Sequence, residues 1–403
     1  MAARTHSALF VLVTIFIDAI GFGLIMPVLP QLLMEVGRIE LSDAIGIGAW
    51  MGLAMAVASF VSAPVLGNLS DRFGRRPVLL LSLTFLSLDY LLLAVANTLP
   101  LVFLGRVLSG AFGGSYAPAM AAVADVSSPE DRAKTFGFVS AAFGIGFVLG
   151  PALGGLLGEY GTRAPFYVAS ALAMLNVVYG LTVFPETLKA ENRRAFSWRR
   201  ANPLGALATA RAAPGMMGVA AVLILWQIAS LVYPMAWSFY VIAQFGWSTS
   251  MIGVSLAAVG VTIAVSQIFI TGPVVKRFGE RDAATIGLIV AIGGFVTYAF
   301  ITESWMAFAA MVAIALQGLV QPSLMAMLSR RATPETQGEV QGISSMALGI
   351  GSIVAPLILT APMAYFTSKA APVYFPGAAF IVAAVVGLLA LVLLRRLPRV
   401  LPV

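Results

Sequence analysis

Apolar residues occur along the chain in long blocks that are separated by short polar or charged breaks. A helix that crosses the hydrocarbon core of a bilayer needs about 20 consecutive apolar residues. The blocks predict twelve such spans, at about 8–33, 44–69, 77–96, 100–123, 135–158, 165–184, 215–241, 249–272, 282–302, 304–328, 338–364 and 374–394. We therefore expect an all-α membrane protein with twelve transmembrane helices.

Composition agrees with a chain whose main solvent is lipid. Of the 403 residues, 60% are hydrophobic and 10% are charged, a balance that water-soluble domains rarely show. The chain has no cysteine and one histidine, so thiolate metal sites and disulfides are excluded and we expect no metal and no cofactor. No nucleophile, base and orienting group come together at one depth, so we do not expect an enzyme.

The distribution of basic residues predicts the orientation in the membrane. With both termini inside, 20 of the 24 Lys and Arg residues lie on the cytoplasmic side, one (Arg106) lies in a span, and three (Arg38, Arg163 and Lys369) lie outside. This bias is typical of cytoplasmic loops and predicts a multi-pass protein of a bacterial inner membrane, with cytoplasmic N and C termini. Because the basic residues lie beside spans, the formal net charge of +7 suits the lipid bilayer and gives no reason to expect nucleic acid as a partner.

The chain repeats itself with a constant offset of 205 residues. The matched residues are Gly67 and Gly272, Phe73 and Phe278, Gly74 and Gly279, Pro129-Glu130 and Pro334-Glu335, Gly137 and Gly342, Gly144-Ile145-Gly146 and Gly349-Ile350-Gly351, and Pro151 and Pro356. A constant offset across loops and spans indicates duplication. It predicts two pseudo-symmetric bundles of six helices, at 1–184 and 215–403, joined by a cytoplasmic linker at 185–214, with a substrate cavity between them.

Three ionisable residues lie well inside predicted spans: Asp18, Asp89 and Arg106. Charges in the membrane are costly and usually face a cavity or a partner. Asp89 and Arg106 are expected at similar depth on adjacent helices, where they can form a charge pair that shapes the cavity. Asp18 lies near the middle of the first span, where it can bind and release the coupling proton; pairing with Arg106 or hydrogen bonding between a helix and a loop are the alternatives.

The loop between the second and third spans reads GNLSDRFGRRP from Gly67 to Pro77. Its glycines permit a tight reversal at the membrane surface, and the proline suits the first turn of the next helix. Asp71 lies among three arginines, Arg72, Arg75 and Arg76. This cluster predicts either a latch of ion pairs that breaks between conformations or a basic patch for anionic lipid headgroups. The corresponding loop of the second half, with Val275 before two basic residues, lacks the acid, so we expect a one-sided latch.

Glycines recur every four residues in the fifth span, at positions 146, 150, 154 and 158, with Pro151 between them. Small residues at this spacing let a neighbouring helix approach closely. The second half has no charge in its spans but carries aromatic and amide side chains that suit an amphipathic ligand. These cavity candidates are Gln227, Tyr233, Trp237, Gln267, Gln317 and Gln321. Packing inside the bundle or anchoring at the membrane interface is the alternative for each of them.

Several of these segments resemble a known family. The loop from Gly67 to Pro77 is similar to the signature between the second and third spans of the major facilitator superfamily. Its continuation through Leu88-Asp89-Tyr90 and the run from Asp18 to Pro30 resemble the tetracycline exporters, a group of proton-coupled drug antiporters. The segment from Gly146 to Gly155 resembles the antiporter signature of the fifth span.

The resemblance implies the major facilitator fold, proton antiport and a partner for the loop in Asp125, at the cytoplasmic end of the fourth span. The cytoplasmic gate is then Gly67, Asp71, Arg72, Gly74, Arg75, Arg76 and Asp125, and the antiporter segment is Gly146, Gly150, Pro151, Gly154 and Gly155. The sequence departs from the family at Ile263 and Ala291, where the exporters typically have a histidine and an acid, so the resemblance does not fix tetracycline as the substrate.

We expect a monomeric secondary transporter that exports small amphipathic compounds, such as drugs, in exchange for protons by alternating access. A proton-coupled or facilitative transporter of an endogenous metabolite is the alternative within transport, because no motif fixes the direction of flux. A transport-inactive membrane receptor or scaffold is the alternative from another class.

Overall fold

The computed structural model describes residues 2–113, 116–128, 131–198, 202, 216–331 and 337–398, and these residues contain helices and no strand. In the first part of the chain the elements are α1 (Ala2–Ile25), α2 (Leu29–Gly37), α3 (Leu41–Phe73), α4 (Arg75–Val95), α5 (Leu99–Phe112), α6 (Tyr116–Val126), α7 (Arg132–Gly158), α8 (Ala164–Val183) and η1 (Ala190–Asn192). In the second part they are α10 (Met216–Ser230), α11 (Val232–Phe245), α12 (Thr249–Val265), η2 (Ser266–Ile270), α13 (Thr271–Phe278), α14 (Glu280–Phe300), α15 (Ser304–Ala313), η3 (Ile314–Leu319), α16 (Val320–Ser329), α17 (Gln337–Ala355), η4 (Pro356–Thr360), α18 (Ala361–Phe366) and α19 (Ala378–Arg396).

Each of the twelve predicted spans coincides with one helix or with two or three consecutive helical elements. Within the described residues, ten helices are long and apolar enough to cross a membrane, and α1 with α2, bent by 50°, makes an eleventh. The predicted fourth span coincides with the shorter apolar helix α5 and with α6 after it. The all-α fold class is confirmed, and the chain is a multi-pass membrane protein.

Helix boundaries reproduce the repeat found in the sequence. The helices α4 and α14 begin 205 residues apart and end 205 residues apart, and the helices before them end at Phe73 and Phe278. At the junctions, Gly74 has φ 107° and ψ 161°, and Gly279 has φ 79° and ψ 164°. A side chain is strained in this region of backbone conformation, which is why both copies of the turn have glycine. Two related halves are therefore present in the structure as well as in the sequence.

Contacts divide the chain into two compact units. The first unit is Met1–Ile39, Ala54–Pro203 and Trp247–Gly260, and the second unit is Glu40–Leu53, Leu204–Gly246 and Val261–Val403. The start of α3 thus groups with the second unit and the start of α12 with the first. These units follow contacts and not the duplication, so the domain boundaries at 1–184 and 215–403 stay a prediction.

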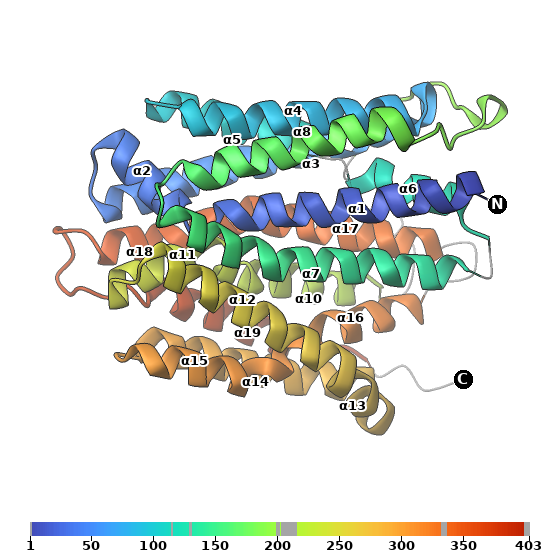
Figure 1. The fold of residues 1–403 in the computed structure, drawn as a ribbon. Helices are drawn as coiled ribbons and strands as arrows, with labels where there is room; N and C mark the ends of the chain where they lie inside the picture. Colours follow the sequence, from blue (N-terminus) through green and yellow to red (C-terminus); the bar gives the residue numbers. More distant parts are fainter. Residues whose placement is uncertain are drawn as a thin grey trace. The chain divides into compact units, whose positions relative to one another are not determined.

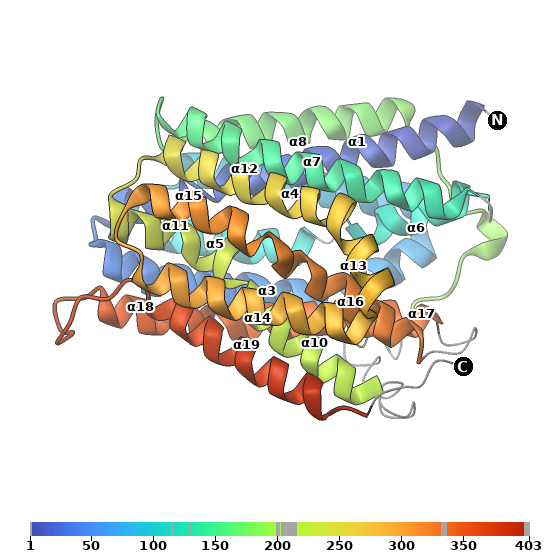
Figure 2. The same cartoon turned by 90° about the horizontal axis from the view of Figure 1, so that it is seen from below.

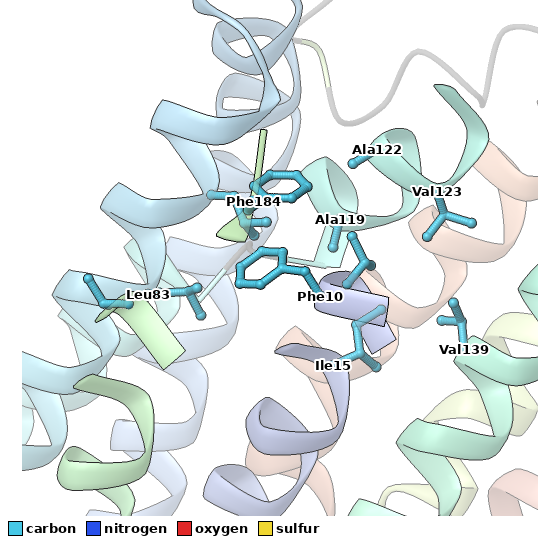
Figure 3. Close-up of a cluster of buried hydrophobic side chains, with 11 residues drawn as sticks. Phe10, Ile15, Leu83, Ala119, Ala122, Val123, Val139 and Phe184 are labelled. Carbon is cyan, nitrogen blue, oxygen red and sulfur yellow. The ribbon is translucent and has the colours of Figure 1, made fainter. Parts of the chain in front are cut away.

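In the first unit, α1 lies along α7 and α8, and α4 lies along α8 (Figure 1). Apolar side chains from these helices and from α6 form a buried cluster around the beginning of α1 (Figure 3). At its centre the rings of Phe10 and Phe184 stack with their centroids 4.4 Å apart. This packing fixes α1 two turns before Asp18.

In the second unit, α14 packs against α16 and α19, and α10 packs against α17 and α19 (Figure 2). Three spans of this unit contain a short segment that is not α-helical. The segments η2 and η4 are π-helical and η3 is a 3-10 helix. Such segments occur frequently at functional sites, and η2 and η3 pack against each other.

Candidate functional site

Asp18 and Tyr90 lie on facing helices of the first unit. A Cβ atom built at Gly21 would lie 2.9 Å from the Tyr90 hydroxyl oxygen, so the end of this ring touches the backbone of α1. Asp18, three residues earlier, lies on the same side of the helix. Asp18 and Asp89 both act electrostatically on Tyr90, which places both acids near the tyrosine. Sequence analysis did not select Tyr90, although its place directly after Asp89 was a signal.

Asp89 and Arg106 lie in the same neighbourhood without direct contact. The Asp89 residue is 1% exposed and Arg106 is 8% exposed, and the guanidinium acts electrostatically on the carboxylate. Neither carboxylate oxygen of Asp89 has a hydrogen-bond partner, and Arg106 donates from Nη2 to Sδ of Met55 at 2.7 Å. The charge of Arg106 therefore acts on Asp89 through space and not through an ion pair.

Arg75 joins three helices of the first unit at the predicted gate. Its Nη1 lies 2.6 Å from Oδ1 of Asp71 at the end of α3, and its Nε lies 3.1 Å from Oδ2 of Asp125 on α6. The same Nη1 donates to the Ser70 hydroxyl at 2.7 Å. The Arg75 side chain is only 10% exposed, and ion pairs at such a site are less screened than at the surface. Asp125, which only the resemblance implied, is thus a direct partner.

Glu186 caps the beginning of α4 and was not foreseen from the sequence. Its two carboxylate oxygens accept the backbone N–H groups of Arg75 at 2.8 Å and Arg76 at 3.2 Å. A side chain at Gly74 would collide with this carboxylate. Carboxylates are stabilising at helix N-termini, and the position of Glu186 at the start of a polar linker was the available signal.

The linker after α8 packs on the gate loop. The N–H of Arg194 donates to the Asp71 carbonyl at 3.0 Å, and the Asn68 side chain donates to the Ser197 carbonyl at 2.7 Å. Linker and gate line an open pocket of about 570 Å³. Its lining residues are Asp71, Arg75, Asp125, Leu188, Glu191, Asn192, Arg193 and Arg194.

The remaining gate residues have structural contacts of their own. Arg72 lies over the Phe73 ring, 4.9 Å from its centroid, and Arg76 donates to the Leu181 carbonyl at the end of α8 at 2.7 Å. A Cβ at Gly67 would meet no atom within 4 Å, so Gly67 is not required by close packing in this conformation.

The second half has an ion pair at the corresponding place, with the charges reversed. Glu280 Oε1 lies 2.7 Å from Arg330 Nη2, and these residues follow Arg75 and Asp125 by 205 positions. The expectation of ion pairs on one side only was therefore wrong, because it considered the loop and not the partner helix. Arg281, which corresponds to Arg76, also donates to carbonyls at a helix end, those of Leu394 and Arg395.

The glycine face of α7 packs directly on backbone. A Cβ at Gly146 would lie 2.6 Å from the Phe16 carbonyl oxygen, and one at Gly150 would lie 2.7 Å from the Ile20 carbonyl oxygen. Gly154 lies against Leu24 of α1, and Gly155 against Gly253 at the start of α12. Pro151 packs on the same two helices, at Gly23 of α1 and Gly253 of α12. The predicted close approach of neighbouring helices is confirmed.

The cavity candidates of the second unit differ in exposure. Trp237 is 1% exposed and Gln317 6% exposed, whereas Gln267 on η2 is exposed. Gln227 packs against Gly351, where a Cβ would lie 2.9 Å from the Gln227 Cβ. Tyr233, Gln317 and Gln321 each have a buried side-chain oxygen without a hydrogen-bond partner. Ala291, at the place of the acid that the exporters typically have, is buried.

A duplicated bundle of membrane-spanning helices with buried acids and charged loops defines the chain as a polytopic membrane transporter. The model of the Major Facilitator Superfamily matches residues 11–239 and 220–402. The chain belongs to this superfamily, whose members transport small molecules across membranes.

Individual relatives cover almost the whole chain. It is 42% identical to the tetracycline resistance protein, class C, of Escherichia coli, over 98% of both chains. It is 37% identical to the tetracycline resistance protein, class G, of Vibrio anguillarum, over 97% of both. Among solved structures it resembles a bacterial homologue of the human lysosomal transporter Spinster, with a TM-score of 0.78 and 14% identity over 98% of this chain and 97% of that one. The last likeness concerns the fold alone.

Proposed function

We propose that this protein is a proton-coupled exporter of small amphipathic compounds, such as drugs and tetracycline-like molecules. It acts as a monomer in a bacterial inner membrane with both termini in the cytoplasm. The observation that carries the proposal is the group of Asp18, Tyr90, Asp89 and Arg106 inside the first unit. The tetracycline resistance proteins that match the chain along its length support export as the direction.

In the proposed cycle, a proton from outside binds the Asp18 carboxylate and leaves to the cytoplasm after the halves have rocked. Tyr90 lies beside Asp18 and Asp89, so its hydroxyl can accept and pass on the hydrogen bond as either acid changes charge. Asp89 and Arg106 give the cavity its charged wall. Arg75, held by Asp71 and Asp125, closes the cytoplasmic side and releases when the halves move.

Transport in proteoliposomes with an imposed pH gradient tests the proposal. Substrate efflux should move protons inward, and Asp18→Asn should abolish proton-driven accumulation while exchange of substrate across the membrane continues, because binding survives and coupling does not. Glu303→Gln, which changes an exposed acid at the start of α15, is the control and should transport normally. If Asp18→Asn still builds a gradient, the coupling site is elsewhere. Reversing the pH gradient distinguishes an exporter from an importer of a metabolite.

A further inference from the structure

Three tyrosines of the second unit belong to one aromatic cluster, but only two of them have partners for their hydroxyl groups. The hydroxyl of Tyr240 donates to the Tyr298 carbonyl at 2.5 Å, and that of Tyr298 donates to the Ala307 carbonyl at 3.2 Å. The Tyr233 ring is held in the same cluster, with centroids 5.8 Å from Phe295 and 6.1 Å from Tyr298. Its hydroxyl is buried and does not complete a hydrogen bond.

Gln317 brings an amide to the Tyr233 hydroxyl. The two side chains are near enough to interact, yet neither the hydroxyl nor Oε1 of Gln317 completes a hydrogen bond. Gln321 follows about one turn later in the same span, and its Oε1 is also buried without a partner. The span therefore presents two amide oxygens that lack donors.

Ser266 adds a hydroxyl from the neighbouring span. Its Oγ is buried without a partner and lies 3.2 Å from where a Cβ of Gly318 would be. Gly318 follows Gln317 in η3, so the absence of a side chain there lets the hydroxyl approach the backbone next to the amide. The π-helical winding of η2 and the 3-10 winding of η3 bring these two spans together at this point.

Buried polar atoms without hydrogen bonds cost free energy, and native proteins keep few of them. Here four such atoms come from three packed spans, beside an aromatic wall. We propose that Tyr233, Ser266, Gln317 and Gln321 form an uncharged subsite that hydrogen-bonds the hydroxyl and amide groups of the exported compound. This inference rests on the proposed function and names its substrate class: molecules with neutral hydrogen-bond donors next to an apolar ring system.

Equilibrium binding to the detergent-solubilised protein tests the subsite without any gradient. The probes are tetracycline, which carries hydroxyl groups and a carboxamide, and tetraphenylphosphonium, which has no hydrogen-bond donor. Tyr233→Phe and Gln317→Met each remove polar atoms and keep most of the volume. Each should raise the Kd for tetracycline about fivefold, the usual effect of one lost hydrogen bond, and leave that for tetraphenylphosphonium within about twofold.

The matched control is Tyr240→Phe, which removes a hydroxyl of the same cluster that already has a partner. It should lower the Tm of the unliganded protein and leave both Kd values unchanged. Tyr233→Phe and Gln317→Met should keep or raise that Tm, because the groups that they remove are unsatisfied without ligand. If Tyr233→Phe or Gln317→Met does not fold, Ser266→Ala is measured in its place.

The subsite is overturned if the unsubstituted protein does not bind tetracycline, or if the variants have an unchanged Kd for tetracycline. A lowered Tm together with an unchanged Kd would mean that these groups bond ordered water and stabilise the fold. Failure of the proposed function has a different signature. Tetracycline binding that weakens in Tyr233→Phe, in a protein that moves no substrate against a pH gradient, would leave the subsite intact and remove proton-coupled export.

Discussion

The functional prediction depends on a few single residues, and the sequence was sufficient to identify the charged ones among them. Asp18, Asp89 and Arg106 were predicted from their depth alone, because a charge in an apolar span is visible in any hydropathy pattern. Tyr90 was missed because a tyrosine in a span is ordinary. The distance between Asp89 and Arg106 was also beyond the sequence, since the rotation of each helix about its axis decides whether two side chains at one depth meet.

The contact between α1 and Tyr90 yields a test at this scale. Gly21→Ala places a methyl group 2.9 Å from the tyrosine hydroxyl, so the protein should lose about 1–3 kcal/mol of unfolding free energy, as overpacked cores do. Combining it with Tyr90→Phe should restore part of the loss, because the nearest atom of the ring is then removed. Unfolding in a detergent titration measures both.

Gly46→Ala is the control for this pair. A Cβ at Gly46 meets nothing within 4 Å, so the substitution should leave stability unchanged or raise it through helix propensity. Equal losses for Gly21→Ala with and without Tyr90→Phe would show that the tyrosine hydroxyl is not the atom in the way.

The extent of the spans was predicted well, and the local winding of the helices was predicted poorly. The spans follow from apolar length, which hydropathy measures directly. The bend between α1 and α2 and the segments η2, η3 and η4 come from packing between helices and leave no trace in composition. Two of the unsatisfied polar atoms of the proposed subsite, on Ser266 and Gln317, lie in η2 and η3, so what the sequence missed at this scale bears on the site.

The junction of α7 with α12 makes a pH-dependent cap. Glu159 accepts the Ser250 N–H at 2.9 Å and the Thr249 hydroxyl at 3.2 Å, and the backbone bond from Ser250 is the main reason why the pKa of Glu159 is lowered. The folded pKa lies below the unfolded one, so the ionised group stabilises this junction above the unfolded pKa, about 4.3. That stabilisation is lost as the pH falls through the folded pKa.

Hydrogen exchange at the amides of 249–252, corrected for the intrinsic rate, measures this cap. Protection should be constant between about pH 5 and 7 and fall at lower pH, where carboxyl groups protonate. In Glu159→Gln it should be weaker and nearly independent of pH. Glu303→Gln, an acid at the start of α15 without a side-chain cap, should leave these amides unchanged; the same pH dependence in Glu159→Gln would assign it to another group.

At the scale of the whole molecule, duplication was readable because glycines and prolines recur at a fixed offset. The structure adds that an ion pair between corresponding helices is present in both halves with its charges inverted. The inverted positions are Asp71 and Lys276, Arg75 and Glu280, and Asp125 and Arg330. A comparison of motifs that looks for identical residues overlooks this relation, because attraction depends on opposite signs and not on which helix carries which sign.

Exchanging the charges of the second pair tests whether it works as a pair. Glu280→Arg and Arg330→Glu each place like charges where 2.7 Å now separates opposite ones, and each should slow transport severalfold. The double variant restores attraction in the orientation of the first half and should recover at least half of the rate. The effect on stability should stay near 1 kcal/mol or below, because the Arg330 side chain is 65% exposed and solvent screens it.

Lys276 explains why the recovery should be incomplete. It lies four residues before Glu280, the separation at which Asp71 pairs with Arg75 in the first half, so the double variant adds a positive charge close to it in the chain. Adding Lys276→Asp reproduces the charge pattern of the first half and should raise the rate further. A double variant as slow as the single ones would mean that these residues act separately, and the inverted gate would then be a feature of sequence without a role in the transport cycle.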